Sequence, residues 1–168
     1  MPHPTTSGTT GPHPNSSMPI TTHAVDAFTA EPKVAILSAV ETVNVKIRST
    51  LDAAALCKMA DRGQIKGGVL DGPLAFDNAI SPEAVQIKHI QSPVAGHADI
   101  LAVPDLESGN MLAKQLEYLG GAEGAGILLG ARVPVVLTSR ADGAKARAMS
   151  ALLCAVVAQH QQAQRLAA

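Results

Sequence analysis

Aromatic residues are almost absent from this 168-residue chain, which has no tryptophan and only Phe28, Phe76 and Tyr118. The core must therefore be built from Ala, Val, Leu, Ile and Met, a composition that suits helices layered on a parallel sheet. The formal net charge is -1 and basic residues form no block. This argues against nucleic acid or an anionic membrane surface as the main partner.

Cysteine is scarce as well, since Cys57 and Cys154 are the only two and lie far apart in apolar, helix-like surroundings. Both are expected to be reduced core residues rather than a disulfide or a metal pair. No apolar run reaches the roughly 18 residues of a membrane span. The N-terminus also lacks the basic and then apolar pattern of a signal peptide. The expected location is the cytoplasm.

Several common motifs are missing too. The sequence has no GxGxxG followed by an acidic residue, no GxxxxGK[ST] and no CxxC, and no segment repeats at a fixed period. The usual nucleotide and zinc motifs and a solenoid fold are therefore excluded.

Two regions differ in composition. Residues 1–24 contain five prolines and almost no large apolar side chains, which predicts a disordered tail. His3, His13 and His23 are too widely spaced there to indicate a metal site. Residues 25–168 form the predicted folded region.

Short apolar runs alternate with helical patterns in this folded region. Strands are predicted at 33–38, up to 70, and at 99–103, 126–129 and 133–138; helices are predicted from a capping box at 49–52 to Gly63, and over 82–88, 112–119 and 149–157. Residues 71–76 are expected to form the loop that leaves the second strand. Ser81 is the predicted N-cap of the second helix. The alternation predicts an α/β domain.

Polar residues follow four of the predicted strands. The four clusters are Ser38 with Glu41, Asp71 with Asp77, residues 105–110, and residues 138–142. If the strands run parallel, all four clusters meet at one edge of the sheet, where α/β folds bind ligands. Asp71 and Asp77 have a simpler interpretation as caps of a turn and a helix.

The last cluster has the richest chemistry. Ser139 offers a hydroxyl, Arg140 a positive fork suited to phosphate, and Asp142 a candidate base. A helix cap by Ser139 with Asp142 as its capping-box partner would explain these two residues but not Arg140, because a cation opposes the dipole of the first helical turn.

Gly109 and Asn110 are expected at a helix start, where backbone N–H groups and the Asn amide could hold a ligand. The alternative is a plain cap by Ser108 or Asn110. His89 and His97 lack ligand spacing and are assigned structural or surface roles.

Together, the segments VAILSAVETVN, STLDAAALCKMADRG, DGPLAFDNAIS, SPVAGHADILAVPDLESGNMLAKQLEYL and VPVVLTSRAD resemble the phosphate acetyltransferase and phosphate butyryltransferase family. The resemblance runs from about Ala30 to about Val157, and it extends to the acyltransferase part of fusions with an enoyl-CoA hydratase-like domain. It implies acyl transfer between CoA and phosphate, with acyl-CoA as a substrate and neither a bound cofactor nor a metal. The implied fold is a two-domain, three-layer α/β/α arrangement similar to isocitrate and isopropylmalate dehydrogenases, usually dimeric.

The resemblance also implies residue roles. Ser139 would stabilise the CoA thiolate or the reacting carbonyl, and Arg140 would hold the phosphoryl oxygens. An Asp would take the thiol proton; acetyltransferase members carry it where this chain has Ala146, so Asp142, as in the butyryltransferase-like pattern, is the candidate. The matching motifs place four residues on the substrate side of the cleft: Asp71, Asp77, Gly109 and Asn110.

The family's catalytic unit is longer than this chain, which resembles its C-terminal portion with an unrelated tail in front, from a truncated gene or a shifted reading frame. One alternative is therefore a non-catalytic remnant that folds, dimerises or binds a partner, with exposed apolar surface where the other half docks. Another is a metal-dependent hydroxy-acid dehydrogenase with Asp71 and Asp77 as magnesium ligands.

Overall fold

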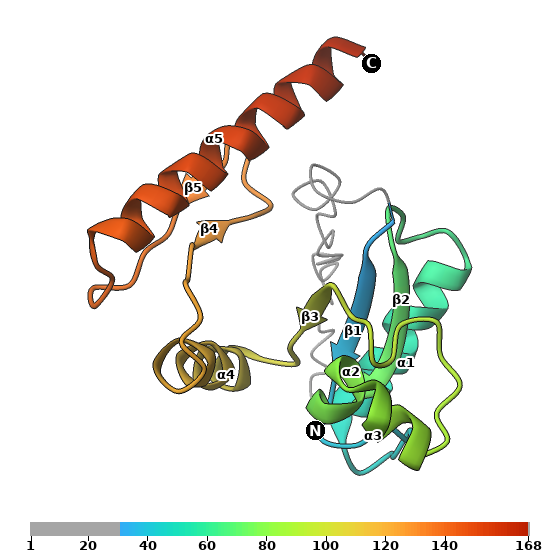
Figure 1. Cartoon of the computed structure of the whole chain (residues 1–168). Helices are drawn as coiled ribbons and strands as arrows, with labels where there is room; N and C mark the ends of the chain where they lie inside the picture. The colour runs from blue at the N-terminus through green and yellow to red at the C-terminus, as the bar shows by residue number, and fades with distance from the viewer. Residues whose placement is uncertain (1–30, 168) are drawn as a thin grey trace, which may run out of the picture.

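The computed structural model of the protein describes residues 31–167, apart from the side chains at 164 and 167, so the predicted tail of residues 1–24 lies outside the described residues. The helices and strands follow in this order (Figure 1): β1 Lys33–Leu37, α1 Arg48–Asp61, β2 Val69–Leu74, α2 Phe76–Ile80, α3 Pro82–Ile87, β3 Ile100–Ala102, α4 Leu106–Tyr118, β4 Ile127–Leu128, β5 Val135–Val136 and α5 Ala144–Ala167. Within this range no helix is both long and apolar enough to cross a membrane.

A parallel sheet of order β2-β1-β3 forms the centre of residues 31–105, which we call the body. Side chains alternate along the middle strand, β1. Val34 and Ile36 pack with Ala53 of α1 in one core cluster, and Ala35 and Leu37 belong to a second cluster. The two clusters lie on opposite faces because successive strand residues point to opposite sides. The predicted α/β class with a parallel sheet is confirmed.

The second cluster is completed by residues from the α2–α3 side of the sheet, including Leu74, Ala79 and Val94. Helices therefore cover both faces of the three-stranded sheet. This explains why β1 is a continuous apolar run rather than an alternation of apolar and polar residues.

Strand β2 extends four residues further than predicted. Asp71 pairs with Ala35, so the residue expected to open a loop lies inside the strand. Gly72 allows the close approach of the two strands, since a Cβ atom there would lie 2.6 Å from the carbonyl oxygen of Ile36. The Gly72–Pro73 pair that predicted a turn is thus a feature of the strand itself.

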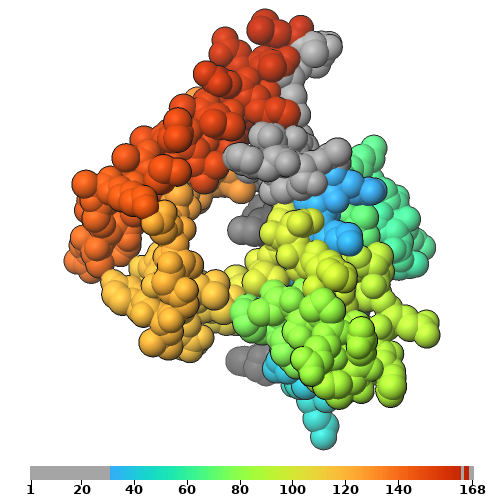
Figure 2. All heavy atoms as spheres, in the orientation of Figure 1, coloured from blue at the N-terminus to red at the C-terminus, as the bar shows by residue number. Residues whose placement is uncertain are grey.

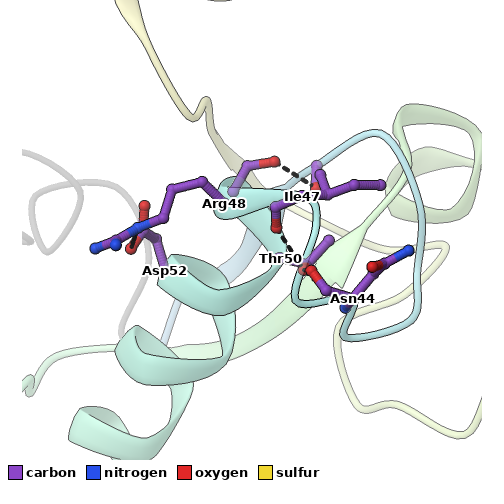
Figure 3. A network of polar contacts seen from close by, with 7 residues as sticks. Asn44, Ile47, Arg48, Thr50 and Asp52 are labelled. Carbon is purple, nitrogen blue, oxygen red and sulfur yellow. Dashed lines mark hydrogen bonds and ion pairs between the residues drawn. The ribbon is translucent and has the colours of Figure 1, made fainter.

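Helix α1 begins without the predicted capping box. Its N-cap is Ile47, whose side chain cannot cap. Thr50 closes the preceding loop instead: its Oγ1 accepts from the backbone N–H of Asn44 at 2.9 Å and lies 2.7 Å from the Ile47 carbonyl oxygen (Figure 3). Arg48 and Asp52 form an i,i+4 ion pair at 2.8 Å on the exposed side (Figure 3).

The predicted N-cap is correct for helix α3 and wrong for helix α4. Ser81 accepts from the backbone N–H of Ala84 at 3.2 Å, so its predicted role as the N-cap of α3 is confirmed. Helix α4 is capped by Asp105, which accepts from the backbone N–H of Ser108 at 2.7 Å. The predicted cap by Ser108 or Asn110 is wrong.

Residues 106–167, which we call the arm, extend away from the body (Figure 1). In the arm, β4 and β5 pair with each other in an antiparallel, two-stranded sheet, and α5 contacts both strands. The last two strands therefore do not join the parallel sheet. Figure 2 shows an open space between the arm and the body.

Candidate functional site

A pocket of about 440 Å³ opens at the carboxyl ends of β1 and β3; we call it the strand-end pocket. It is lined by Leu37, Ser38, Ala39, Ser49, Phe76, Val103, Pro104, Asp105, Ser108 and Leu112. Its size suits a small ligand, and its position is the one at which α/β sheets bind ligands. The predicted meeting of polar clusters at this edge is correct for Ser38 and Asp105.

Hydroxyl groups and one carboxylate form the polar edge of the strand-end pocket. The Oγ atoms of Ser38 and Ser49 lie 2.8 Å apart and share a hydrogen bond. Asp105 Oδ1 accepts from both the hydroxyl and the backbone N–H of Ser108. These bonds lower the pKa of Asp105 below its usual 3.8, and the bond from the Ser108 hydroxyl has the largest effect. The pocket therefore combines an apolar wall with a fixed anionic and hydroxylic end.

Sequence reasoning did not identify Ser49 or Phe76 as pocket residues. Ser49 was assigned to a helix cap, although its position in the first turn after the β1 loop carries it to the strand ends. Phe76 is the first residue of α2, a helix that the sequence did not predict. Aromatic residues are rare in this chain, and that rarity was the one sequence feature that could have marked Phe76 as a site residue.

Asp71, predicted to bind substrate, lies away from the lining of the strand-end pocket. It sits in the middle of β2, and its carboxylate accepts from the backbone N–H of Gly72 at 2.9 Å. Its position supports the local geometry of the strand.

Asp77 occupies the first turn of α2 and pairs with Lys88, whose Nζ lies 3.0 Å from Asp77 Oδ2 and 3.5 Å from Glu41 Oε2. The hydrogen bond from Lys88 is the main cause that lowers the pKa of Asp77. The fully buried Asn78 donates from Nδ2 to Glu41 Oε2 at 3.1 Å. This cluster ties the loop after β1 to α2 and α3. No group of three potential metal ligands occurs in residues 31–167.

Gly109 and Asn110 lie inside α4 rather than at an open helix start. The backbone N–H of Gly109 donates to the carbonyl of Asp105 at 3.1 Å and is not available to a ligand. A Cβ atom at Gly109 would lie 2.8 Å from Cγ2 of Val103, so the glycine is needed for packing. Asn110 is exposed. Substrate binding by Gly109 and Asn110 stays a prediction.

Ser139, Arg140 and Asp142 lie in a tight turn before α5, which we call the 139–142 turn. Asp142 Oδ2 accepts from the backbone N–H of Ser139 at 2.7 Å, and Ser139 Oγ accepts from that of Ala141 at 3.3 Å. These bonds resemble a capping box, but the helix begins only at Ala144. Within residues 31–167 the Arg140 guanidinium and the hydroxyl hydrogen of Ser139 have no partner, so both are available to a ligand.

A second pocket of about 280 Å³, the arm pocket, lies between the end of α4 and the start of α5. It is lined by Glu117, Tyr118, Ala122, Glu123, Gly124, Ala141, Asp142, Gly143, Lys145, Ala146 and Met149. Ion pairs link Lys114 to Glu117 at 2.7 Å and Lys145 to Glu123 at its edge. Asp142 thus belongs to a different pocket from Asp105, and neither pocket contains both predicted groups.

Comparison with known proteins relates these two sites to a family. The family model described as phosphate acetyl/butaryl transferase matches residues 10–155. The chain belongs to this family. The match begins inside the segment 1–24, which was expected to be an unrelated tail, and it includes the 139–142 turn and the lining of the strand-end pocket.

Individual relatives agree with the family. A phosphate acetyltransferase of Rhizobium meliloti is 62% identical over 153 residues, which are 89% of this chain and 48% of that protein. A phosphate butyryltransferase of Clostridium acetobutylicum is 54% identical over 127 residues, 76% of this chain and 42% of that protein. The crystal structure of a branched-chain phosphotransacylase from Enterococcus faecalis matches with a TM-score of 0.72 and 37% identity, covering 82% of this chain and 49% of that one. The chain spans about half the length of these relatives.

Proposed function

We propose that this chain carries the catalytic turn of a phosphate acyltransferase, which moves an acetyl or butyryl group between CoA and inorganic phosphate. The observation that carries the proposal is the 139–142 turn, because within the described part of the chain it leaves an arginine fork and a hydroxyl hydrogen unpaired, in a region matched by the family. The names of the acetyl- and butyryltransferase relatives support the same reaction.

The reaction needs a group that binds phosphate, a donor that stabilises the developing negative charge and a base for the thiol, and the turn can supply all three. A phosphate oxygen attacks the thioester carbonyl carbon, the new C–O bond forms, the C–S bond breaks, and CoA leaves as a thiolate that is then protonated. Arg140 would hold the phosphate through its planar fork of N–H donors. Ser139 would donate its hydroxyl hydrogen to the developing oxyanion or to the thiolate.

Asp142 would act in the reverse reaction, which starts from free CoA and acyl phosphate. There the thiol must lose its proton before sulfur can attack the acyl phosphate, because the thiolate is the nucleophile. Oδ2 of Asp142 is held by the Ser139 N–H, and Oδ1 has no donor within residues 31–167, so it is free to accept the thiol proton. This chemistry requires no bound cofactor, and CoA is a substrate.

We place the strand-end pocket opposite this turn, in a cleft between two α/β/α domains of the isocitrate/isopropylmalate dehydrogenase-like type. Its apolar wall of Leu37, Val103 and Leu112 suits an acyl chain or the pantetheine part of CoA. Asp71, Asp77, Gly109 and Asn110 remain proposed substrate-side residues of this cleft, and Gly109 also packs against Val103 of the wall. The cytoplasmic location and the homodimer remain predictions of the sequence.

The test is phosphate-dependent release of CoA thiol from acetyl-CoA and butyryl-CoA, with Arg140→Ala compared to Arg62→Ala. Arg62 is an exposed arginine at the end of α1, so it controls for the loss of charge alone. The expected result is a fall in kcat/KM of about 100-fold or more for Arg140→Ala and no change for Arg62→Ala. Thiol release no higher than that of a Ser139→Ala variant would sink the proposal.

One observation favours a second function, in which the chain binds a partner without catalysis. Apolar side chains of the arm are widely exposed, as in Leu137 and Leu152. No arrangement of the described residues favours a magnesium-dependent dehydrogenase, since Asp77 is paired with Lys88 and Asp71 lies within β2.

A further inference from the structure

The loop that leaves β1, residues 38–47, forms part of the strand-end pocket and is exposed over much of its length. Ser38 and Ala39 at its start line the pocket, whereas residues 42–46 are exposed. Exposed loops move more than the helices and strands that they connect. The pocket residues of this loop therefore keep one arrangement only if other parts of the molecule hold the loop in place.

Hydrogen bonds hold the loop at its end and in its middle. At its end, the backbone of the loop is bonded to Thr50 of α1 (Figure 3). In its middle, Glu41 Oε2 accepts from Asn78 Nδ2 at 3.1 Å and lies 3.5 Å from Lys88 Nζ. Glu41 is nearer in sequence to the pocket residues of the loop, so its contacts have the more direct hold on the pocket.

Asn78 is the firmer of these two partners of Glu41. The Lys88 side chain exposes 35% of its surface, and ion pairs that are this accessible to water contribute little. Asn78 is fully buried, and its backbone carbonyl accepts from the N–H of Gly96 at 2.7 Å. Asn78 therefore presents its amide to Glu41 from a fixed position.

The buried amide of Asn78 uses only part of its hydrogen-bonding capacity. Its Oδ1 is buried, and no donor of residues 31–167 bonds to it. A buried polar atom without a partner is costly, and an apolar side chain of similar shape would stabilise the same position at least as well. Departures of this kind from good packing are expected where function requires a residue. The contact of Nδ2 with Glu41 therefore explains the amide better than stability does.

The bond between Glu41 and Asn78 also joins two walls of the strand-end pocket. Glu41 belongs to the loop that contributes Ser38 and Ala39. Asn78 belongs to α2, whose first residue, Phe76, lines the same pocket. The bond therefore fixes these two walls relative to each other.

The loop helps to present one hydroxyl hydrogen to the pocket. The hydroxyls of Ser38 and Ser49 share a single hydrogen bond of 2.8 Å, so one of their two hydrogens has no acceptor among the described residues. The Asp105 carboxylate lines the same pocket and repels anions. An uncharged group that accepts a hydrogen bond suits this arrangement, and the thioester and amide carbonyls of acyl-CoA are groups of this kind.

We propose that Asn78 is a positioning residue of the strand-end pocket, which holds the loop through Glu41 and so places the Ser38–Ser49 hydroxyl pair against a carbonyl group of acyl-CoA. Asn78 does not itself line the pocket. This role rests on the proposed function, which supplies the ligand. Without the bond, the loop adopts its binding arrangement for only a fraction of the time, and the apparent Kd rises by the inverse of that fraction.

The experiment measures binding of butyryl-CoA to the full chain by isothermal titration calorimetry in the absence of phosphate. Asn78→Leu keeps the branching at Cγ and removes both Nδ2 and the unpaired Oδ1. Its Kd is expected to rise about tenfold, as for a loop that keeps its binding arrangement about a tenth of the time. Its urea midpoint is expected to stay close to that of wild type, because the Glu41 side chain is 29% exposed and is not left buried without a partner.

Variants of Glu41 separate the hydrogen bond from the ion pair. Glu41→Gln keeps an oxygen that accepts from Asn78 and loses only the charge facing Lys88, so its Kd is expected within about threefold of wild type. Glu41→Ala removes the acceptor at a partly exposed position and should weaken binding as much as Asn78→Leu. Combining these two changes should add nothing further, because both break the same bond. The matched control is Thr42→Ala, at the exposed next residue of the loop, which should leave the Kd unchanged.

A second measurement follows the loop without any ligand. NMR order parameters of the backbone amides at residues 39–43 are expected near about 0.85 in the wild-type chain and below about 0.6 in Asn78→Leu and Glu41→Ala. Thr42→Ala and Glu41→Gln should keep the wild-type values. This readout separates a loop that has lost its anchor from a chain that has lost its fold.

The outcomes that would overturn this role are distinct from failure of the acyl-transfer assay. One is a Kd for Asn78→Leu equal to that of Thr42→Ala, and another is unchanged order parameters in Asn78→Leu. A third is equally weak binding by Glu41→Gln and Glu41→Ala, which would assign the hold on the loop to Lys88. Absence of butyryl-CoA binding by the wild-type chain would overturn the acyl-CoA assignment itself, and the positioning role with it.

Discussion

Substitution of Gly72 by alanine tests how the central sheet is built. A Cβ atom at this position would lie 2.6 Å from the carbonyl oxygen and 2.8 Å from the Cβ of Ile36. Ile36 belongs to β1, which has a strand on each side and a core cluster on each face. The strand therefore has no direction in which to move away from the added methyl group.

The magnitude follows from two opposing effects. Overpacking of a closed core costs about 1–3 kcal/mol, and the contact with a fixed backbone atom places this case near the upper limit. Removing a glycine stabilises by about 0.4–1 kcal/mol through the unfolded chain. We expect a net loss of about 2 kcal/mol in the free energy of unfolding. With a urea slope of about 2 kcal/mol per molar, the midpoint falls by about 1 M.

Cys57 provides a local assay of this loss, because its Sγ lies 3.5 Å from the carbonyl oxygen of Gly72. Pulse alkylation across a urea gradient, read by mass spectrometry of the Cys57 peptide, reports unfolding around this residue. Gly143→Ala is the matched control, since no atom of the described residues, apart from its chain neighbours, lies within 4 Å of the added Cβ. It is expected to stay within about 0.5 kcal/mol of wild type. A Gly72→Ala midpoint equal to that of the control would refute the reasoning.

Three further predictions concern pH and capping. Burial, followed by the charges of Asp71 and Asp61, raises the pKa of Cys57 from 9.0 to about 11. The thiol therefore loses its proton at lower pH in the unfolded chain, and the free energy of unfolding should fall as pH rises from 9.0 to about 11. Cys57→Ala should remove this pH dependence, as measured by urea titrations. A hydrogen bond from Lys88 is the main cause that lowers the pKa of Asp77 from 3.8, and a backbone hydrogen bond is the main cause that lowers the pKa of Glu41 from 4.5. The stabilisation that these two carboxylates provide is therefore complete above pH 4.5 and is lost as pH falls through the lowered pKa values. Lys88→Met should reduce this loss of stability at acid pH, and an unchanged pH dependence would contradict the ion-pair cluster. Ser81→Ala should cost about 1 kcal/mol through loss of the α3 cap, measured as a shift of the urea midpoint, whereas Ser81→Asp should restore most of it.

The body could be predicted in large part from its sequence. A continuous apolar run gave β1, and Ser81 followed by Pro82 marked the start of α3, because burial on both faces and helix capping leave strong local patterns. The extent of β2 could not be predicted, because Gly72 and Pro73 favour a turn locally and only the pairing of Asp71 with Ala35 keeps them in a strand.

The start of α4 was ambiguous for a related reason. Asp105, Ser108 and Asn110 are all good cap residues, so local sequence does not decide among them, and the structure shows that Asp105 is the cap.

The candidate site was predicted in part. Ser38 and Asp105 do meet at the ends of parallel strands, as the sequence order indicated. The 139–142 turn does not join them, because its preceding strand β5 pairs antiparallel with β4 in a separate sheet. An apolar run shows that a strand is buried, but it does not show which sheet the strand joins or in which direction.

Formation of acyl phosphate is the measurement that tests the central claim most directly. The chain is incubated with butyryl-CoA and phosphate, and acyl phosphate trapped as the hydroxamate is compared with released thiol. Transfer to phosphate predicts equal amounts of both products, with both lost in Ser139→Ala. Thiol release without acyl phosphate, or equal product from Ser139→Ala, would contradict the assignment of the 139–142 turn as the catalytic centre.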